Sequence, residues 1–181
     1  SPLISDPGFK LVRYCINNNI NVTTVPGPSA IISGLQLSGL SLNQFYFAGF
    51  FPKTKKHMND FIESIKNTQQ TCVFFVSNHK IQECLEILSL KIKEREISVC
   101  KEITKKNEQV FRGKSINVKN KLLENNKNLK GEFVVVVGSN NLKKAEMVEL
   151  ASNKDEMYKL LKKFSLTDVA EIVHKLTGNK K

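Results

Sequence analysis

Three short loops contain residue types that can hold a small ligand, and each one follows or interrupts a predicted strand or helix. Their sequences are SPLISDPG (residues 1–8), PGPSA (26–30) and SNHK (77–80). In open α/β sheets, ligands bind outside the carboxyl ends of the strands. Within PGPSA, Gly27 permits close approach, and a helix that starts near Ser29 offers free N–H groups. This loop predicts a site for a carboxylate or hydroxyl, and a tight turn without a ligand is the alternative.

A basic segment, PKTKKH (residues 52–57), follows Phe50 and Phe51 and is the best local candidate for nucleic-acid binding. Lysine ammonium groups can bind phosphates while neighbouring aromatic rings stack on bases. Three lysines at the start of a helix oppose the helix dipole, which favours acidic residues there. A solvated helix N-terminus is the alternative interpretation.

Charged side chains also gather in KEITKKNEQ (residues 101–109), where Glu102 and Lys105 lie near the end of a predicted strand. Charged groups at the end of a strand are typically exposed, so a solvated run of charges is the alternative to a functional site. His79 could act as a base or contact RNA, and a role in capping a helix is equally plausible. The chain has no G-x-G-x-x-G, Walker loop, metal-binding cluster or Ser-His-Asp order. Spacing alone therefore names no reaction.

The composition is that of a soluble globular protein with a polyanionic partner. The 181 residues are 40% hydrophobic and 25% charged, and 28 Lys and Arg against 17 Asp and Glu give a net charge of +11. Such a charge favours nucleic acid ahead of a membrane surface. No apolar run approaches the roughly 20 residues that span a bilayer. The four cysteines lack C-x-x-C spacing, which favours a reducing cytoplasm and argues against a metal site.

Alternating strand and helix patterns predict an α/β fold that positions these loops. A helix is expected from Asp6 as N-cap, with Pro7 at its first position, and a second one from Ser29. Apolar spacing predicts further helices around residues 58–65, 81–88 and 115–125 and in the tail. The predicted strands are 21–25, 45–50, 71–76, 97–103, 108–113 and 131–138.

Read together, these segments resemble a known family. SPLISDPG, VPGPSA, GFFPK, FFVSNHK, KEITKKNEQVFRG and GEFVVVV have the order and spacing of the tetrapyrrole methylase superfamily. Within it they resemble the ribosomal RNA small subunit methyltransferase I subfamily, which methylates the ribose 2′-hydroxyl of a cytidine in 16S ribosomal RNA. The resemblance covers nearly the whole chain, and SPLISDPG combined with PGPSA is its most specific part.

The resemblance implies an S-adenosylmethionine-dependent enzyme with two α/β domains, the cofactor between them and a homodimeric assembly. Residues 1–47 would be the C-terminal part of the first domain, 48–140 the second domain, and 155–181 the start of a small helical region. The implied cofactor contacts are Ser1, Pro2, Leu3, Ile4, Ser29, Ala30, Phe75, Val76, Ile103, Thr104, Glu132 and Phe133. The candidate catalytic residues are Glu102 and Lys105, and the candidate RNA contacts are Lys53, Lys55, Lys56, Lys80 and Arg112.

The chain departs from the family pattern in two respects. Where the family commonly has Glu-Ser-Pro-His-Arg, residues 76–80 read Val-Ser-Asn-His-Lys, so the acid and the arginine of the motif are absent. No segment matches the first strand and Gly/Pro-rich loop of the family, and the tail resembles only the start of the helical C-terminal region. A chain shortened at both ends is therefore expected.

Two other functions stay open from the sequence. One is a methylase of the same superfamily that acts on a small tetrapyrrole or on a protein side chain, although the net charge and the KTKKH segment argue against it. The other is a non-catalytic RNA-binding fragment, because part of the first domain has no match. Binding of S-adenosylmethionine would separate this last possibility from the two enzymes.

Overall fold

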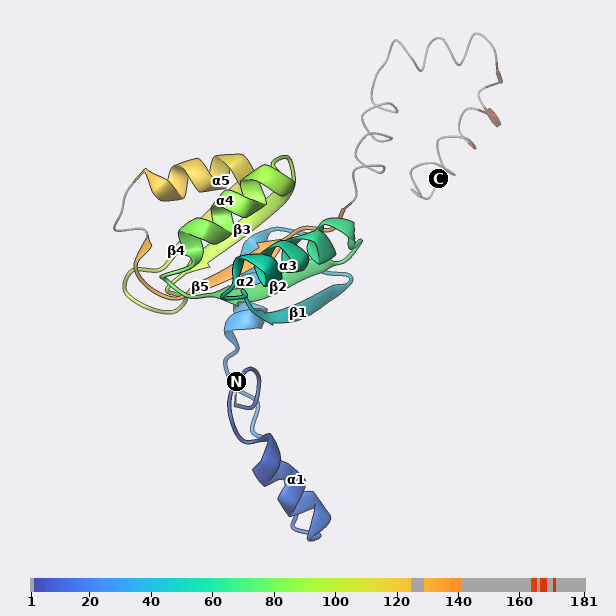
Figure 1. Cartoon of the computed structure of the whole chain (residues 1–181). Coiled ribbons are helices and arrows are strands. Elements are labelled where there is room, and N and C mark those ends of the chain that lie inside the picture. Colours follow the sequence, from blue (N-terminus) through green and yellow to red (C-terminus); the bar gives the residue numbers. More distant parts are fainter. Residues whose placement is uncertain (1, 125–128, 141–163, 166, 169–170, 172–181) are drawn as a thin grey trace. The chain divides into compact units, whose positions relative to one another are not determined.

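A five-stranded mixed sheet lies at the centre of the first of two units, Ser1–Asn140 and Asn141–Lys181, into which the chain divides (Figure 1). The computed structural model describes residues 2–124, 129–140, 164–165, 167–168 and 171. The sheet has the order β1-β2-β5-β3-β4. Its strands are β1 (Phe45–Phe50), β2 (Thr71–Val76), β3 (Glu96–Lys101), β4 (Gln109–Lys114) and β5 (Phe133–Val137).

Strand β5 lies between β2 and β3 and runs antiparallel to both. Strand β1 is parallel to β2, and β4 is antiparallel to β3. The carboxyl ends of β1, β2 and β3 therefore share one edge of the sheet with the amino end of β5. This is the edge where open α/β sheets bind ligands.

The helices are α1 (Phe9–Asn17), α2 (Ala30–Ser38), α3 (Lys55–Asn67), α4 (Ile81–Lys91) and α5 (Ser115–Leu123). Helices α2 to α5 cover the two faces of the sheet, whereas α1 buries no residue. Helices α3, α4 and α5 pack with Phe133, Val135 and Val137 of β5 on one face. Helix α2 packs with Val134 and Val136 on the other. Because side chains alternate along a strand, β5 supplies both cores, and all five of its residues are buried.

Most of the predicted elements are confirmed, and with them the α/β class. Helix α3 fully buries Met58, Ile62 and Ile65 along one face, as the apolar spacing predicts. The Ser29 side chain accepts a hydrogen bond from the Ile32 N–H at 3.5 Å and caps α2, as expected. Gly34 lies so close to β5 that a Cβ atom there would be 2.7 Å from a methyl carbon of Val134.

Three local predictions are wrong. Residues 21–25 form no strand and are all exposed, because no described segment pairs with them and β propensity alone does not make a strand. Helix α1 is capped at Gly8 (φ 130°) instead of at Asp6, since the left-handed backbone at Gly8 interrupts the helix start. The strand predicted to reach Ile103 ends at Lys101, because Glu102 also takes a left-handed φ of 50°.

The helical region predicted for residues 155–181 falls mostly outside the described residues. Among those that are described, Ser165 and Asp168 exchange backbone-to-side-chain hydrogen bonds of 3.2 Å, as residues in the first turn of a helix do. Within the described part of the chain, no helix has the length and apolar character needed to cross a bilayer. The boundary between residues 47 and 48 stays a prediction.

A buried arginine joins two elements at the edge of the sheet opposite the ligand-binding edge. Arg95 is 8% exposed and donates from Nε to the Gly138 carbonyl at 2.7 Å, just beyond β5. Its two Nη atoms donate to the carbonyls of Ile65, Lys66 and Thr68, where α3 ends. A cation at a helix C-terminus is stabilised by the helix dipole and satisfies carbonyls that have no partner within the helix.

We expect Arg95→Met to lower the free energy of unfolding by about 3 kcal/mol, because it leaves several buried carbonyls without donors. Urea denaturation followed by circular dichroism measures this loss. Arg112→Met is the matched control, since Arg112 is exposed and donates to one carbonyl, that of Leu37. Its loss should stay below about 1 kcal/mol. Equal losses in the two variants would contradict a structural role for the Arg95 bonds.

Candidate functional site

A cavity of about 420 Å³ opens at the edge of the sheet where the parallel strands end. Its apolar walls come from the start of α2, the ends of β1 and β2, the loop after β3 and the start of β5. Its polar groups come from the loop after β2 and the segment before β5. The lining residues are Ala30, Phe50, Phe75, Val76, Ser77, Asn78, Ile103, Gly131, Glu132, Phe133 and Val134. The volume is within the range of small-molecule sites.

A smaller cavity of about 240 Å³ shares three of these walls, Ala30, Phe50 and Phe75. Its other sides are formed by residues 4–6 and by Ser29 and Ile31. The rings of Phe50 and Phe75 contact each other, with their centroids 5.2 Å apart and their planes inclined at 55°. The two cavities therefore meet at an aromatic wall, an arrangement that can hold two flat ligands near one another.

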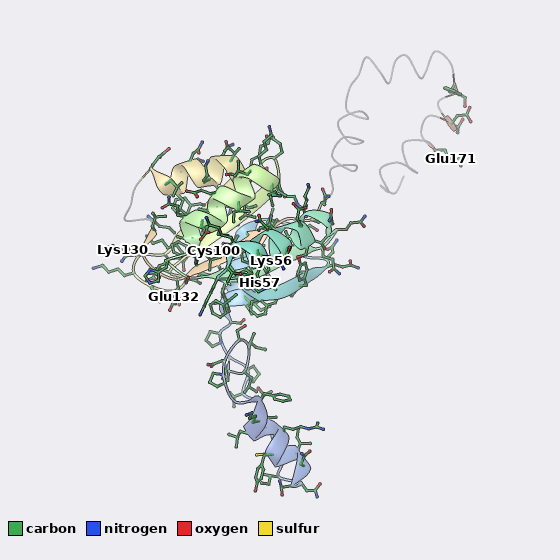
Figure 2. All side chains as sticks on the ribbon, in the orientation of Figure 1. Lys56, His57, Cys100, Lys130, Glu132 and Glu171 are labelled. Carbon is green, nitrogen blue, oxygen red and sulfur yellow. The ribbon has the colours of Figure 1, made fainter. Side chains whose placement is uncertain are left out.

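The rim of the larger cavity is held by Glu102. Its Oε1 accepts hydrogen bonds from the Glu132 N–H at 2.8 Å and from the Lys105 ammonium at 3.0 Å. The Glu102 N–H donates to the Glu132 carbonyl at 2.9 Å, and Lys105 also donates to Oε2 of Glu132 at 2.9 Å. Figure 2 shows Glu132 and Lys130 in the segment that leads into β5. These bonds join the loop after β3 to that segment.

Gly131 is required for this contact. Its φ is 118°, and a Cβ atom there would lie 2.7 Å from Cγ of Glu102. Glu102 (φ 50°) and Thr104 (φ 65°) have left-handed backbone conformations, which are unfavourable for residues with a side chain. The Thr104 N–H donates to Oε2 of Glu108 at 2.6 Å. Strain of this kind persists only where surrounding bonds fix it, and it is common at functional sites.

The charges in this cluster stabilise one another. The N–H of Glu132 and then the Lys105 ammonium lower the pKa of Glu102 below its usual value. The carboxylates of Glu132 and then Glu102 raise the pKa of Lys105. At neutral pH Glu102 is therefore ionised and Lys105 is protonated. A carboxylate with a lowered pKa is a weak base, so the cluster is better suited to positioning than to accepting a proton.

The structure brings together most of the residues expected to contact the cofactor. Of these residues, the larger cavity is lined by Ala30, Phe75, Val76, Ile103, Glu132 and Phe133, and the smaller one by Ile4, Ser29, Ala30 and Phe75. Pro2, Leu3 and Thr104 line neither cavity. Ser1 lies outside the described residues. Whether these residues contact a cofactor stays a prediction.

The five residues expected to contact RNA differ in their surroundings. Lys53, Lys55 and Lys56 are exposed at the start of α3 (Figure 2 labels Lys56). Lys80 pairs with Glu83 at 2.7 Å on α4, and Arg112 donates to the carbonyl at the end of α2. The first three are therefore the ones most available to phosphates.

The expected cofactor contacts omit five residues that line the larger cavity: Phe50, Ser77, Asn78, Gly131 and Val134. Ser77 and Asn78 belong to the SNHK loop, whose position after a strand was a usable signal. Gly131 had no comparable signal, because its role depends on Glu102, a residue distant in the sequence. Within the described ranges, no three His, Cys, Asp or Glu side chains are grouped as a metal site would require.

Known proteins resemble this chain in sequence. The family profile described as Tetrapyrrole (Corrin/Porphyrin) Methylases matches residues 1–118. A protein of Halalkalibacterium halodurans named "Ribosomal RNA small subunit methyltransferase I" is 38% identical over 112 residues, which are 62% of this chain and 39% of that protein. A Vibrio cholerae protein with the same name is 40% identical over 111 residues, 61% of this chain and 38% of that protein. The chain thus spans about two fifths of the length of these relatives.

Solved structures agree on the fold. The methyltransferase CobJ superposes with a TM-score of 0.50 at 16% identity, over 72% of this chain and 56% of that one. A diphthine synthase superposes with a TM-score of 0.50 at 15% identity, over 72% of this chain and 54% of that one. With a family match that covers residues 1–118 and a methylase-like fold around the cavity, the chain belongs to the tetrapyrrole (corrin/porphyrin) methylase family.

Proposed function

We propose that this protein takes part in the S-adenosylmethionine-dependent 2′-O-methylation of a cytidine ribose in the RNA of the small ribosomal subunit. The single observation that carries the proposal is the 38–40% identity to proteins named ribosomal RNA small subunit methyltransferase I. The net charge of +11 supports an RNA substrate over a small tetrapyrrole or a protein side chain. The choice of the 2′-oxygen and of cytidine comes from the resemblance of the loop motifs.

The larger cavity suits the adenosyl part of S-adenosylmethionine. Phe75, Ile103 and Phe133 offer apolar walls for a purine, and Ser77, Asn78 and Glu132 offer hydrogen-bonding groups for a ribose. When bound, S-adenosylmethionine supplies a methyl group from its positively charged sulfur. The ribose oxygen accepts this methyl group as its hydroxyl loses a proton. The fold contributes by holding the two reactants in line and by excluding water from the cavity.

Glu102 and Lys105 are the proposed assistants of this transfer. Their bonds to the segment 131–132 support a role in which they fix the rim of the cofactor site. Lys105, held protonated by two carboxylates, can attract RNA phosphate but cannot accept a proton. A proton-accepting role would fall to Glu102 or to water.

The direct test is methyl transfer from tritiated S-adenosylmethionine to small ribosomal subunits that lack the modification. The 181-residue chain and the full-length product of its gene are compared. We expect label in 2′-O-methylcytidine after nuclease digestion in at least one of the two. Label on a tetrapyrrole or protein instead would contradict the RNA substrate. Binding of RNA without binding of S-adenosylmethionine by either protein would favour a non-catalytic RNA-binding role.

Replacing Lys53, Lys55 and Lys56 together by Ala should weaken RNA binding and flatten its salt dependence. Each phosphate contact to single-stranded RNA contributes about 0.7 to the slope of log K against log salt, so the slope should fall by up to about 2. Fluorescence anisotropy of a labelled RNA between low and high salt measures it. The matched control removes three lysines that are ion-paired in the structure, Lys66, Lys91 and Lys114. An unchanged slope in the first variant, or equal changes in both, would contradict the assignment.

Glu102→Gln separates positioning from proton transfer. The amide oxygen can still accept the Glu132 N–H, so we expect transfer at a rate close to that of the wild type if Glu102 positions the rim. Loss of a general base would instead lower kcat by about 10²–10⁴-fold. Glu102→Gly, which relieves the left-handed backbone but removes the acceptor, should weaken binding of S-adenosylhomocysteine in calorimetry. A large loss of kcat in Glu102→Gln with unchanged cofactor binding would assign Glu102 the proton-accepting role.

A further inference from the structure

A shift in the register between β1 and β2 places the ring of Phe50 against that of Phe75 at the end of β1. In the parallel pairing of β1 with β2, Phe47 is opposite Val73 and Phe50 is opposite Phe75. An advance of three residues along β1 therefore corresponds to an advance of two residues along β2. Gly49 takes up the extra residue with a φ of 77°, a conformation that favours glycine. Register shifts of this kind, such as β-bulges, are common next to active sites.

The ring of Phe50 is exposed to solvent, whereas that of its neighbour Phe51 is not. Phe50 is 57% exposed, while Phe51 is 5% exposed and packs against Phe61 and Phe74 in the core. Burying a phenylalanine would stabilise the fold, so an exposed ring at this position is unfavourable for stability alone. Of the two adjacent phenylalanines, only Phe50 can meet a ligand.

The location of Phe50 indicates what kind of ligand. The ring is part of the wall of both cavities and contacts Phe75. Lys53, Lys55 and Lys56 follow it within six residues and are exposed at the start of α3. In the part of the chain that the structure describes, the ion pairs involve other lysines. An exposed ring followed by free ammonium groups is the combination that binds single-stranded RNA, since bases stack on the ring and phosphates meet the cations.

We propose that Phe50 is a substrate-positioning residue on which a nucleobase of the acceptor RNA stacks, at the junction of the two cavities. This proposal rests on the RNA substrate proposed above. A base on the exposed face of Phe50 would bring its ribose to the opening of the larger cavity, where the cofactor is proposed to bind. The lysines at the start of α3 would then hold the phosphates that follow.

The test compares Phe50→Leu with Phe45→Leu in the full chain. Phe45 begins the same strand, is 42% exposed and lines neither cavity, so it is a matched control. We expect Phe50→Leu to weaken binding of a fluorescein-labelled, cytidine-containing single-stranded RNA by about fivefold or more. Phe50→Trp should restore the affinity, because indole also stacks on bases. The slope of log K against log salt should match that of the wild type, since no phosphate contact is removed.

Two further measurements make the result decisive. Thermal unfolding should show that Phe50→Leu folds like the wild type, and calorimetry with S-adenosylhomocysteine should show a smaller loss of affinity for the cofactor than for the RNA. Equal RNA affinity in Phe50→Leu and the wild type would overturn the stacking role while leaving the RNA substrate intact. Loss of cofactor binding alone would mean that Phe50 is only a wall of the larger cavity. Failure of the wild type to bind RNA would overturn the proposed substrate, and the role of Phe50 with it.

Discussion

The packing of the sheet and of helices α2 to α5 depends on the burial of β5 on all sides. Its residues pair with β2 along one edge and with β3 along the other, while its two faces belong to two separate cores. Every backbone N–H and C=O of a strand so enclosed must be paired within the protein, because water cannot reach it. One segment of five residues therefore contributes to the packing of the helices on both faces of the sheet. A change in the register of β5 would exchange its two faces and disturb both cores.

The site is a consequence of this arrangement. Because β5 enters the sheet at the edge where β2 and β3 end, Phe133 and Val134 are opposite the last residues of these two strands. The loop after β3 is then fixed by the bonds of Glu102 to the backbone of Glu132. The unfavourable backbone conformations of Glu102 and Thr104 are held in place by the hydrogen bonds that these residues make within the rim. A rim fixed by such bonds reduces the ordering that binding would otherwise require.

The sequence predicts what depends on neighbouring residues and misses what depends on distant ones. The runs at 71–76 and 133–137 are apolar and β-branched, so their burial as strands was predictable. The prediction of a strand at 21–25 failed because propensity does not supply a partner. The contact between Glu102 and Glu132 joins residues 30 positions apart, and the register shift near Gly49 depends on the pairing of β1 with β2. The resemblance of the family motifs predicted many of the residues that line the cavities, but not the contact between Phe50 and Phe75 where the cavities meet.

The position of β5 also bears on the order in which the chain can fold. As the protein is synthesised, β2 and β3 are complete about 30 residues before β5 appears, yet they are not neighbours in the finished sheet. Until residues 133–137 arrive, each exposes an apolar edge without its final partner. β2 and β3 run in the same direction, so they could pair directly as parallel strands before β5 is available to lie between them. Such a pairing would be a non-native trap. The segment that completes the cavity is thus also the last strand along the chain to join the sheet.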